Sequence, residues 1–373
     1  MLEGAGNGRP RFITYGHAKF YGQDGIVMQK LGAAIIGCGA IYPLHAGSIE
    51  ELEDAELRMV IDTDPKKAQA AASRYGCEAA SDYKVLLERE DIQIVHLCTP
   101  HYLHAEMAIE LLAAGKHVLT EKPIAENAAA ARAMTEAAKK SRSQLGVTFQ
   151  NRYNDASRII HEYIASGELG KLVCMKGIVT WNRGRAYYES GAWRGKWATE
   201  GGGVLINQAI HTLDLLQWFG GEISSVKGSV TSDTLEDAIE VEDTAHACID
   251  FANGARALFY GTNGYGTDSP VELEIVFEHG VLTQRRDSLY LWKDGQETRL
   301  SEPPHSNFGG KSYWGPSQRK LIADFYAHVR EDRPFWIDGE EGIKALQLIE
   351  ALYERTRSGQ GLRFPPSNAV LLK

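Results

Sequence analysis

Three groups of residues in this chain have types and spacings that could carry chemistry. The first is the glycine-rich turn at 37–42, which follows the short apolar segment AAIIG and precedes a helical stretch. Such a turn lets a dinucleotide pyrophosphate approach the backbone at a helix N-terminus. Asp62 ends the next apolar segment 23 residues after Gly39, near the spacing of about 20 that a ribose-binding carboxylate shows. We predict that the residues of this cofactor site include Gly37, Gly39, Ala40, Ile41 and Asp62.

The same residues bear on which dinucleotide binds. A carboxylate at Asp62 predicts NAD, because it would repel the 2′-phosphate of NADP. Lys66 and Lys67 follow closely and leave NADP open. Tyr42 replaces the third glycine of the GxGxxG pattern, so a purely structural glycine-rich turn is the alternative interpretation.

The second group is the segment GKHVLTEKP at 115–123. Taken alone, Lys122 would be a solvated loop lysine. It follows an apolar segment that is typical of a parallel strand, however, and ligands bind at the carboxyl ends of such strands. A lysine there can donate a hydrogen bond to a substrate hydroxyl and favour the alkoxide that precedes hydride loss.

The third group is EGGGVLINQAIHTLD at 200–214, where three glycines precede a helical pattern. Asn207 and His211 are four residues apart, so one continuous helix of about 204–219 would place them on one face. We predict that His211 is a general acid or base, against the commoner role of a histidine buried in the core. Asp214 either fixes the tautomer of His211 or anchors the helix.

The elements that must position these groups change character along the chain. Apolar strands and helices alternate from about residue 30 to 150, which is typical of a parallel sheet covered by helices on both faces. Longer consecutive strands follow, with less helix between them, which indicates an antiparallel sheet. We therefore predict an α/β fold with an N-terminal dinucleotide-binding Rossmann domain at 28–150. The predicted second domain, at 151–373, is an α+β unit with a large, mostly antiparallel open sheet.

Composition supports a two-domain protein and excludes several functions. A chain of 373 residues exceeds the roughly 150 of an ordinary domain, and its net charge of −9 argues against nucleic acid as a partner. No run approaches the ~18 apolar residues of a membrane span. The five cysteines form no metal or disulfide pattern, so we expect no metal and a cytoplasmic location. Residues 1–27 are glycine-rich without periodicity. Three interpretations remain open: a flexible arm, a misassigned start codon with Met28 as the natural first residue, and an added tail.

Four motifs in order give the chain a family resemblance: GCGAI at 37–41, CTP at 98–100, AGKHVLTEKP at 114–123, and GGG followed by Asn-x3-His-x2-Asp. Together they resemble the Gfo/Idh/MocA family, the glucose–fructose oxidoreductase and inositol dehydrogenase-like NAD(P)-dependent oxidoreductases. The resemblance implies a site between the two domains, with Lys122 and His211 catalytic, and a C-terminal sheet used for homo-oligomerisation as a dimer or tetramer. Asn207 departs from many members, which have Asp there, and this lowers the case for inositol as the substrate.

Further site residues follow from the resemblance and from positions at strand ends. Thr99 and Pro100 would lie beside the nicotinamide ribose, and WRGKW at 193–197 resembles a segment near the cofactor. Core or interface tryptophans are the alternative for that segment. The remaining expected cofactor contacts are His104, Glu121, Lys122, Trp193 and Arg194. The expected substrate contacts are Lys122, Gln150, Arg152, Asn207, His211 and Tyr313.

The resulting hypothesis is an NAD(P)-dependent oxidoreductase that transfers a hydride between nicotinamide and a secondary hydroxyl of a sugar, polyol or sugar derivative. His211 would take the hydroxyl proton, Lys122 would polarise the oxygen, and Asn207 would position the substrate or the His211 ring. Alternatives are a nucleotide-sugar dehydrogenase or reductase of the same fold, NAD-dependent glycoside hydrolysis, and a non-catalytic NAD(P)- and sugar-binding regulator. The identity of the sugar is beyond the sequence.

Overall fold

The first sheet is built from the N-terminal half of the chain. The computed structural model describes residues 30–286, 288–302 and 317–358. Six parallel strands pair in the order β3-β2-β1-β4-β5-β6, which confirms the predicted Rossmann arrangement. The strands are β1 (Leu31–Ile36), β2 (Ala55–Ile61), β3 (Glu78–Ala80), β4 (Ile94–Leu97), β5 (His117–Thr120) and β6 (Leu145–Val147). The helices between them are α1 (Tyr42–Glu50), α2 (Pro65–Tyr75), α3 (His104–Ala113) and α4 (Ala128–Lys140), with 3₁₀ turns η1 (Tyr83–Glu88), η2 (His101–Leu103) and η3 (Gln150–Tyr153).

Local sequence explains where these elements begin and end. Strand β4 is buried along its whole length, as a central parallel strand covered on both faces must be. Helix α2 begins where the Asp64 side chain accepts a hydrogen bond from the backbone N–H of Lys66, and it ends at Gly76 with a left-handed φ of 66°. Asn127 caps α4 in the same way, through the backbone N–H of Ala130. These caps fix the loops that join strands to helices beside the site.

The second sheet is larger and mixed. Eight strands pair in the order β14-β13-β12-β11-β7-β10-β9-β8, and only β7 and β10 run parallel, which confirms a mostly antiparallel sheet. The strands are β7 (Leu172–Thr180), β8 (Ile223–Thr231), β9 (Thr244–Phe251), β10 (Arg256–Thr262), β11 (Glu272–Phe277), β12 (Gly280–Arg285), β13 (Ser288–Lys293) and β14 (Gln296–Arg299). The helices are α5 (Asp155–Ser166), α6 (Arg185–Glu189), α7 (Val204–Asn207), α8 (Ile210–Gly220), α9 (Gln318–Arg330) and α10 (Gly339–Arg357).

The predicted single helix over about 204–219 is wrong, because the structure divides it into α7 and α8. The backbone N–H of Ala209 bonds to the carbonyl of Val204, one residue further back than in a regular α-helix. This wide turn falls between Asn207 and His211 and alters their spacing on the surface. The regular four-residue relation between the two side chains therefore does not hold.

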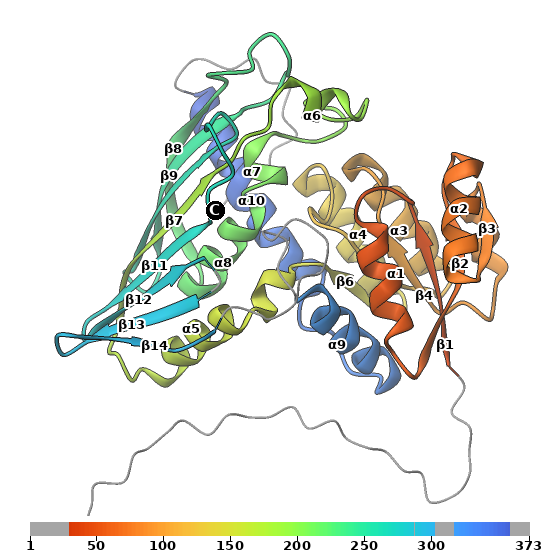
Figure 1. Ribbon diagram of the computed structural model, residues 1–373, viewed down its shortest axis with the longest axis horizontal. Helices are drawn as coiled ribbons and strands as arrows, with labels where there is room; N and C mark the ends of the chain where they lie inside the picture. The colour runs from red at the N-terminus through yellow and green to blue at the C-terminus, as the bar shows by residue number, and fades with distance from the viewer. Residues whose placement is uncertain (1–29, 287, 303–316, 359–373) are drawn as a thin grey trace, which may run out of the picture.

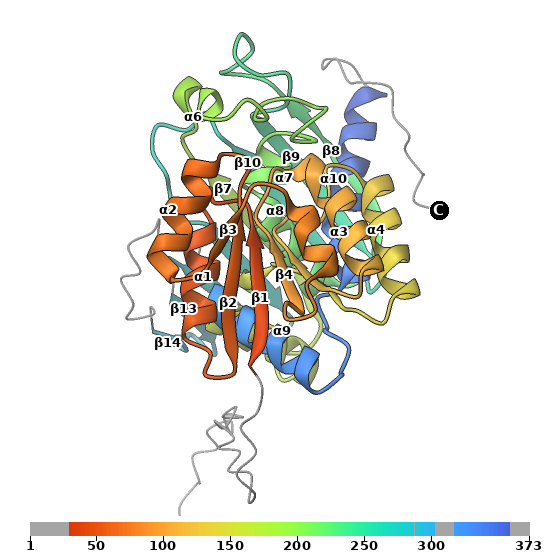
Figure 2. The same ribbon diagram turned by 90° about the vertical axis from the view of Figure 1, so that its right-hand side faces the viewer.

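Helices α5, α8 and α10 lie between the large sheet and the N-terminal half (Figure 1). In Figure 2 the strands β1, β2 and β4 face the viewer, and α7 and α8 lie behind them. Helix α9 packs on α1, while α10 packs on both α4 and β8, so the end of the chain ties the two halves together. In the part of the chain that the structure describes, no helix covers the opposite face of the large sheet (Figure 1).

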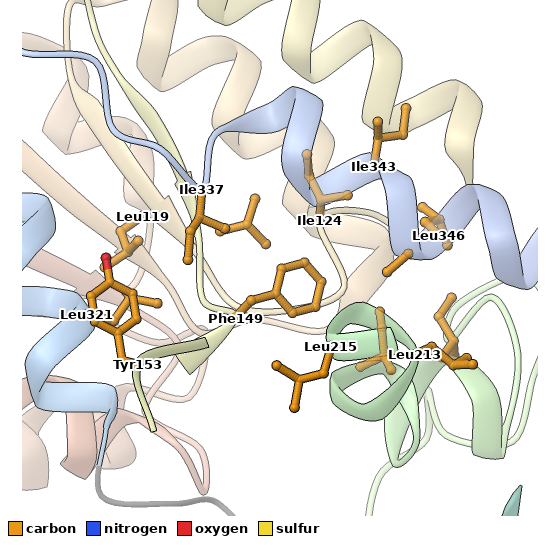
Figure 3. Close-up of a cluster of buried hydrophobic side chains, with 14 of the residues drawn as sticks. Leu119, Ile124, Phe149, Tyr153, Leu213, Leu215, Leu321, Ile337, Ile343 and Leu346 are labelled. Atoms are coloured by element: carbon orange, nitrogen blue, oxygen red, sulfur yellow. The ribbon is translucent and has the colours of Figure 1, made fainter. Parts of the chain in front are cut away.

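A continuous hydrophobic core joins the two halves. Figure 3 shows Phe149, at the end of the first sheet, between Leu213 and Leu215 of α8 and side chains of α10. Phe149, Leu213 and Ile124 are fully buried in this core. The core therefore fixes α8, the helix that carries His211, against the loops that follow β5 and β6.

Candidate functional site

The glycine-rich turn after β1 has the geometry that a dinucleotide needs. Gly37 has a φ of +98°, and an added Cβ there would lie 2.5 Å from the carbonyl oxygen of Cys98. At Gly39, by contrast, an added Cβ would meet nothing within 4 Å, which leaves room for a ligand to approach the backbone. Helix α1 then begins after Ile41 without a side-chain cap, so its N-terminus is open to an anion. Exposed Ala40 lies in the same turn.

Asp62 lies beside this turn, as predicted. One carboxylate oxygen accepts the backbone N–H of Cys38 at 2.9 Å, and the other accepts that of Asp64 at 2.9 Å. The side chain is therefore held at the end of β2, next to the turn where the pyrophosphate would lie. These residues fit an NAD molecule whose ribose hydroxyls meet a carboxylate.

His104 supports the turns on both sides of the site and does not line it. Its two ring nitrogens lie 2.9 Å from the carbonyl oxygens of Thr99 and Pro123, and the side chain is fully buried. This corrects the expected contact between His104 and the cofactor, since both nitrogens face backbone oxygens. Thr99 Oγ1 is buried and has no partner among the described residues, which fits a contact to the bound cofactor. Pro100 lies beside it, at the start of η2.

Lys122 follows β5 and reaches across to α7. Its Nζ donates to the backbone oxygen of Asn207 at 2.8 Å and lies 3.4 Å from Asn207 Oδ1. The pKa of Lys122 is lowered overall from 10.5 to about 8, because burial and the charge of Arg194, which lower it, outweigh the charges of Glu121 and Glu200, which raise it. Lys122 thus remains a cation near neutral pH, and two of its N–H groups are directed at Asn207.

His211 lies near this ammonium group. Burial, reinforced by the positive charge of Lys122, lowers the pKa of His211 from 6.5 to about 3. The imidazole is therefore neutral at physiological pH. Its Nδ1 is buried without a hydrogen-bond partner among the described residues. Phe149 contacts the ring edge to face at 6.0 Å and fixes its plane. A neutral ring with an unused nitrogen is suited to receive a proton from a ligand.

Asp214 does not contact His211. It accepts two hydrogen bonds from the guanidinium of Arg152, at 2.9 Å from Nε and 2.7 Å from Nη2, and both side chains are buried. A third Arg152 nitrogen donates to Glu341 of α10 at 2.9 Å. This corrects the expected substrate contact of Arg152, because its donors face carboxylates inside the protein. Of the two roles considered for Asp214, the structure supports the helix anchor.

Glu121 is also directed into the protein. Its Oε1 accepts from His45 Nε2 at 2.9 Å and from Gln318 Nε2 at 3.0 Å. Although burial raises the pKa of Glu121, the His45 hydrogen bond and charge, together with Lys122, lower it overall from 4.5 to about 2. Glu121 is therefore an anion that adjoins Lys122 and links it to α1 and α9. Its expected contact with the cofactor stays a prediction.

Arg194 stacks on two aromatic rings, those of Tyr187 and Trp193. The Arg194 guanidinium lies 4.4 Å from the ring centre of Tyr187 and 4.5 Å from that of Trp193. Trp193 in turn packs on His101 with ring centres 4.8 Å apart. Because His101 precedes α3 and Trp193 lies in the C-terminal half, these rings bring the two halves together. Arg194 acts electrostatically on Lys122 and stacks on Trp193, which supports a role for both residues in the site.

Two expected substrate residues are less informative. Gln150 is buried in η3, directly after Phe149. Tyr313 lies outside the described residues. Their proposed roles stay predictions.

Sequence reasoning missed several groups that the structure brings to Asn207. Glu200 Oε1 accepts from Asn207 Nδ2 at 2.5 Å, and Tyr187 Oη lies 3.2 Å from the same nitrogen. Gln208 donates to Tyr187 Oη at 3.0 Å. The only signal for Glu200 was its position directly before the three glycines, and its partners come from loops that no local pattern joins.

Comparisons with known proteins agree with this geometry. Residues 31–149 match the family described as oxidoreductase family, NAD-binding Rossmann fold. Residues 157–283 match the GFO/IDH/MocA C-terminal domain. No helix in the described part of the chain is long and apolar enough to cross a membrane.

Three of the similar proteins are dehydrogenases by name. Levoglucosan dehydrogenase of Pseudarthrobacter phenanthrenivorans is 26% identical over 92% of this chain and 100% of its own length. D-glucoside 3-dehydrogenase of Escherichia coli is 27% identical over 90% of this chain and 98% of its own. The structure of the WlbA dehydrogenase from Bordetella pertussis, in complex with NADH and UDP-GlcNAcA, is 28% identical with a TM-score of 0.77, covering 91% of this chain and 100% of that one.

Proposed function

Because this chain belongs to the Gfo/Idh/MocA family of oxidoreductases, we propose that it oxidises a secondary hydroxyl of a sugar or sugar derivative at the site formed by Lys122, Asn207 and His211. The chain is an NAD-dependent enzyme of a family that acts on CH–OH groups. NAD supplies the hydride acceptor at the C4 position of its nicotinamide ring. The observation that carries the proposal is the unpartnered buried Nδ1 of a neutral His211 near the Lys122 ammonium.

Each protein group has a defined task in this reaction. The neutral His211 ring takes the proton of the substrate hydroxyl. Lys122 donates a hydrogen bond to the same oxygen and stabilises the negative charge that develops there. Asn207 holds the ammonium through its two oxygens, so that the donor is already oriented when substrate binds. Gly37, Gly39 and Asp62 bind and orient the cofactor.

A nucleotide sugar is a second substrate class worth testing. The observation in its favour is the full-length likeness to the WlbA dehydrogenase, whose structure holds UDP-GlcNAcA. The two classes differ in size and charge, so one screen separates them. The cytoplasmic location stays a prediction.

The test is a screen for NADH formation over anhydrosugars, glucosides, inositols and UDP-sugars, with NAD and NADP in parallel. We expect turnover with NAD, and a loss of kcat of roughly 10²- to 10⁴-fold in Lys122→Ala and His211→Ala. Thermal unfolding of both variants checks that they are folded. If either variant turned over substrate at the parent rate, the proposed roles would be wrong. Tight NADH binding without turnover of any compound would favour a regulatory protein instead.

We further propose that two copies associate through the uncovered face of the large sheet. Leu258 and Tyr260 of β10 and Trp292 of β13 are 55%, 41% and 49% exposed, although they are large and apolar. Such residues commonly mark an interface. Light scattering should show an oligomer that Leu258→Glu weakens, whereas a monomeric parent protein would refute this arrangement.

A further inference from the structure

The loop before α7 contains a buried carboxylate, Glu200, for which the described residues supply no ion-pair partner. Glu200 is 1% exposed, and its two oxygens accept hydrogen bonds from neutral groups, the backbone N–H of Gly195 at 2.5 Å and Asn207 Nδ2 at 2.5 Å. Burial raises the pKa of Glu200 above its usual value of 4.5, and these two hydrogen bonds and the charges of Arg194 and Lys122 offset only part of that rise. Burying a carboxylate without an opposite charge in contact is unfavourable, and such groups often have a role in a functional site.

Glu200 determines which way the amide of Asn207 points. A carboxylate accepts hydrogen bonds and donates none, so the Asn207 NH₂ group must face it. The same NH₂ group lies 3.2 Å from Tyr187 Oη, which also receives donors from Gln208 and Arg194. The other end of the amide, Oδ1, is thereby turned toward Lys122 at 3.4 Å. The reverse orientation would set the NH₂ group against an ammonium and remove the partner of Glu200.

This orientation decides how the donors of Lys122 are used. An ammonium has three N–H groups. The backbone oxygen and Oδ1 of Asn207 engage two of them. One N–H group then remains for the oxygen of a substrate. The direction of that remaining group is set by the two bonds that Asn207 accepts.

We propose that Glu200 is a positioning residue for Lys122, acting through the Asn207 amide, so that one N–H of the ammonium is aimed at the substrate oxygen. This inference rests on the proposed function, because it presumes that Lys122 polarises that oxygen. Glu200 itself touches neither Lys122 nor the reacting atoms at hydrogen-bond distance.

Glu200 also contributes a negative charge that Lys122 senses. Its charge raises the pKa of Lys122, against the larger lowering by burial. The charged and titratable groups that act on Lys122 or are acted on by it are Glu121, Arg194, Glu200, His101, His104 and His211. Loss of the Glu200 charge leaves the cation Arg194 opposed by Glu121 alone. The pKa of Lys122 should then fall below about 8.

The first test measures Lys122 directly and needs no substrate. The full-length protein is labelled with ¹³Cε-lysine, saturated with NADH and titrated by NMR, and Lys122→Arg identifies the signal. In Glu200→Gln we expect the pKa of Lys122 to fall by roughly one unit. The matched control is Glu189→Gln, the same change at an exposed residue of α6, which should leave the titration unaltered. An unchanged titration in Glu200→Gln would overturn the inference.

The second test moves the charge. Glu200→Gln should lower kcat about tenfold on the best compound of the screen, shift the alkaline limb of the pH–rate profile down with the NMR titration, and leave NADH affinity within about twofold. In the double variant Glu200→Gln/Asn207→Asp a carboxylate faces Lys122 directly, so the alkaline limb should return toward its parent position. Failure of the double variant to restore it would show that Glu200 acts only on the fold.

A third variant covers the case in which Glu200→Gln does not fold. Glu200→Asp keeps the charge but shortens the side chain, so we expect a normal alkaline limb with a lowered kcat. If Glu200→Asp kept the parent kcat, the contact with Asn207 would not matter. These outcomes are separable from those of the proposed function: parent activity in Lys122→Ala refutes the function, whereas an inactive Lys122→Ala beside an unaltered Glu200→Gln refutes only the role of Glu200.

Discussion

The ion pair between Arg152 and Asp214 predicts a large and specific loss of stability in Asp214→Asn. The Arg152 side chain is 1% exposed and the Asp214 side chain 0%. Removing one partner of such a pair leaves an uncompensated buried charge, which costs about 3–5 kcal/mol. Asn keeps the shape and one acceptor oxygen, and Glu341 still balances part of the guanidinium charge, so the lower value of about 3 kcal/mol applies. At ~2–4 °C per kcal/mol, the melting temperature should fall by roughly 6–12 °C.

The assay is urea and thermal unfolding of the two proteins at pH 7, with Glu340→Gln as the control. Glu340 lies on α10 beside Glu341, but its ion pair with Lys139 is 55% and 52% exposed, so its loss should cost less than ~1 kcal/mol. Folded Asp214→Asn should retain kcat within about twofold, because Asp214 does not contact His211. Two results would refute the reasoning: an Asp214→Asn protein as stable as the control, or one of parent stability with a large loss of kcat.

Three further predictions concern the cofactor turn and acid stability. Gly39→Val should keep the parent melting temperature but weaken NADH binding at least about tenfold, because its side chain enters open space where the pyrophosphate would lie. Gly37→Ala should instead lose stability, because residue 37 has a φ of +98° and an added Cβ there would clash with Cys98. Fluorescence titration with NADH and melting curves check both, and a Gly39→Val protein with parent affinity would contradict the assignment. Asp62→Ser should raise the kcat/KM ratio of NADP to NAD, measured by initial rates, since the carboxylate that repels a 2′-phosphate is removed; an unchanged ratio would place the ribose elsewhere. Finally, stability should decline in acid. The pKa of His211 is lowered from 6.5 to about 3, so its contribution is complete above pH 6.5 and is lost as pH falls toward 3. Glu121, lowered from 4.5 to about 2, follows below pH 4.5, and a urea midpoint that stays constant from pH 7.5 to 4 would argue against the buried neutral imidazole.

The fold and the cofactor turn were accessible from sequence because they depend on local patterns. The apolar run of β1, the turn at Gly37 and the acid at Asp62 lie within one stretch of chain. Their geometry follows from strand and helix periods that any buried parallel sheet imposes. The run of consecutive strands that indicates the second sheet is also a local pattern. The order of those strands in the sheet is not, because it pairs segments that are far apart in the chain.

The interior of the site was less accessible, because its contacts join distant segments. Arg152 and Asp214 are 62 residues apart, and Lys122 and Asn207 are 85 apart. An arginine or a histidine can hydrogen-bond a ligand or another group of the protein. Only the packing in the folded chain shows that Arg152 and His104 bond to protein groups. The break between α7 and α8 was hidden for a similar reason. Gln208, which lies at the break, bonds through its side chain to Tyr187 and Asn263, and no periodicity encodes those partners.

The same buried environment leaves Lys122 charged and His211 neutral at physiological pH. Burial disfavours the charged form of both groups and lowers both pKa values. Lys122 starts from 10.5 and stops at about 8, so it stays protonated and cationic at neutral pH, whereas His211 starts from 6.5 and reaches about 3, so it is a neutral imidazole with one nitrogen able to accept a proton. The same desolvated space therefore holds a cationic donor beside a neutral acceptor, the pair that oxidation of a hydroxyl requires. Since His211 stays neutral throughout the upper range, the loss of activity in alkali should follow Lys122. The midpoint of that loss should move when a charged group that acts on Lys122, such as Glu200, is neutralised.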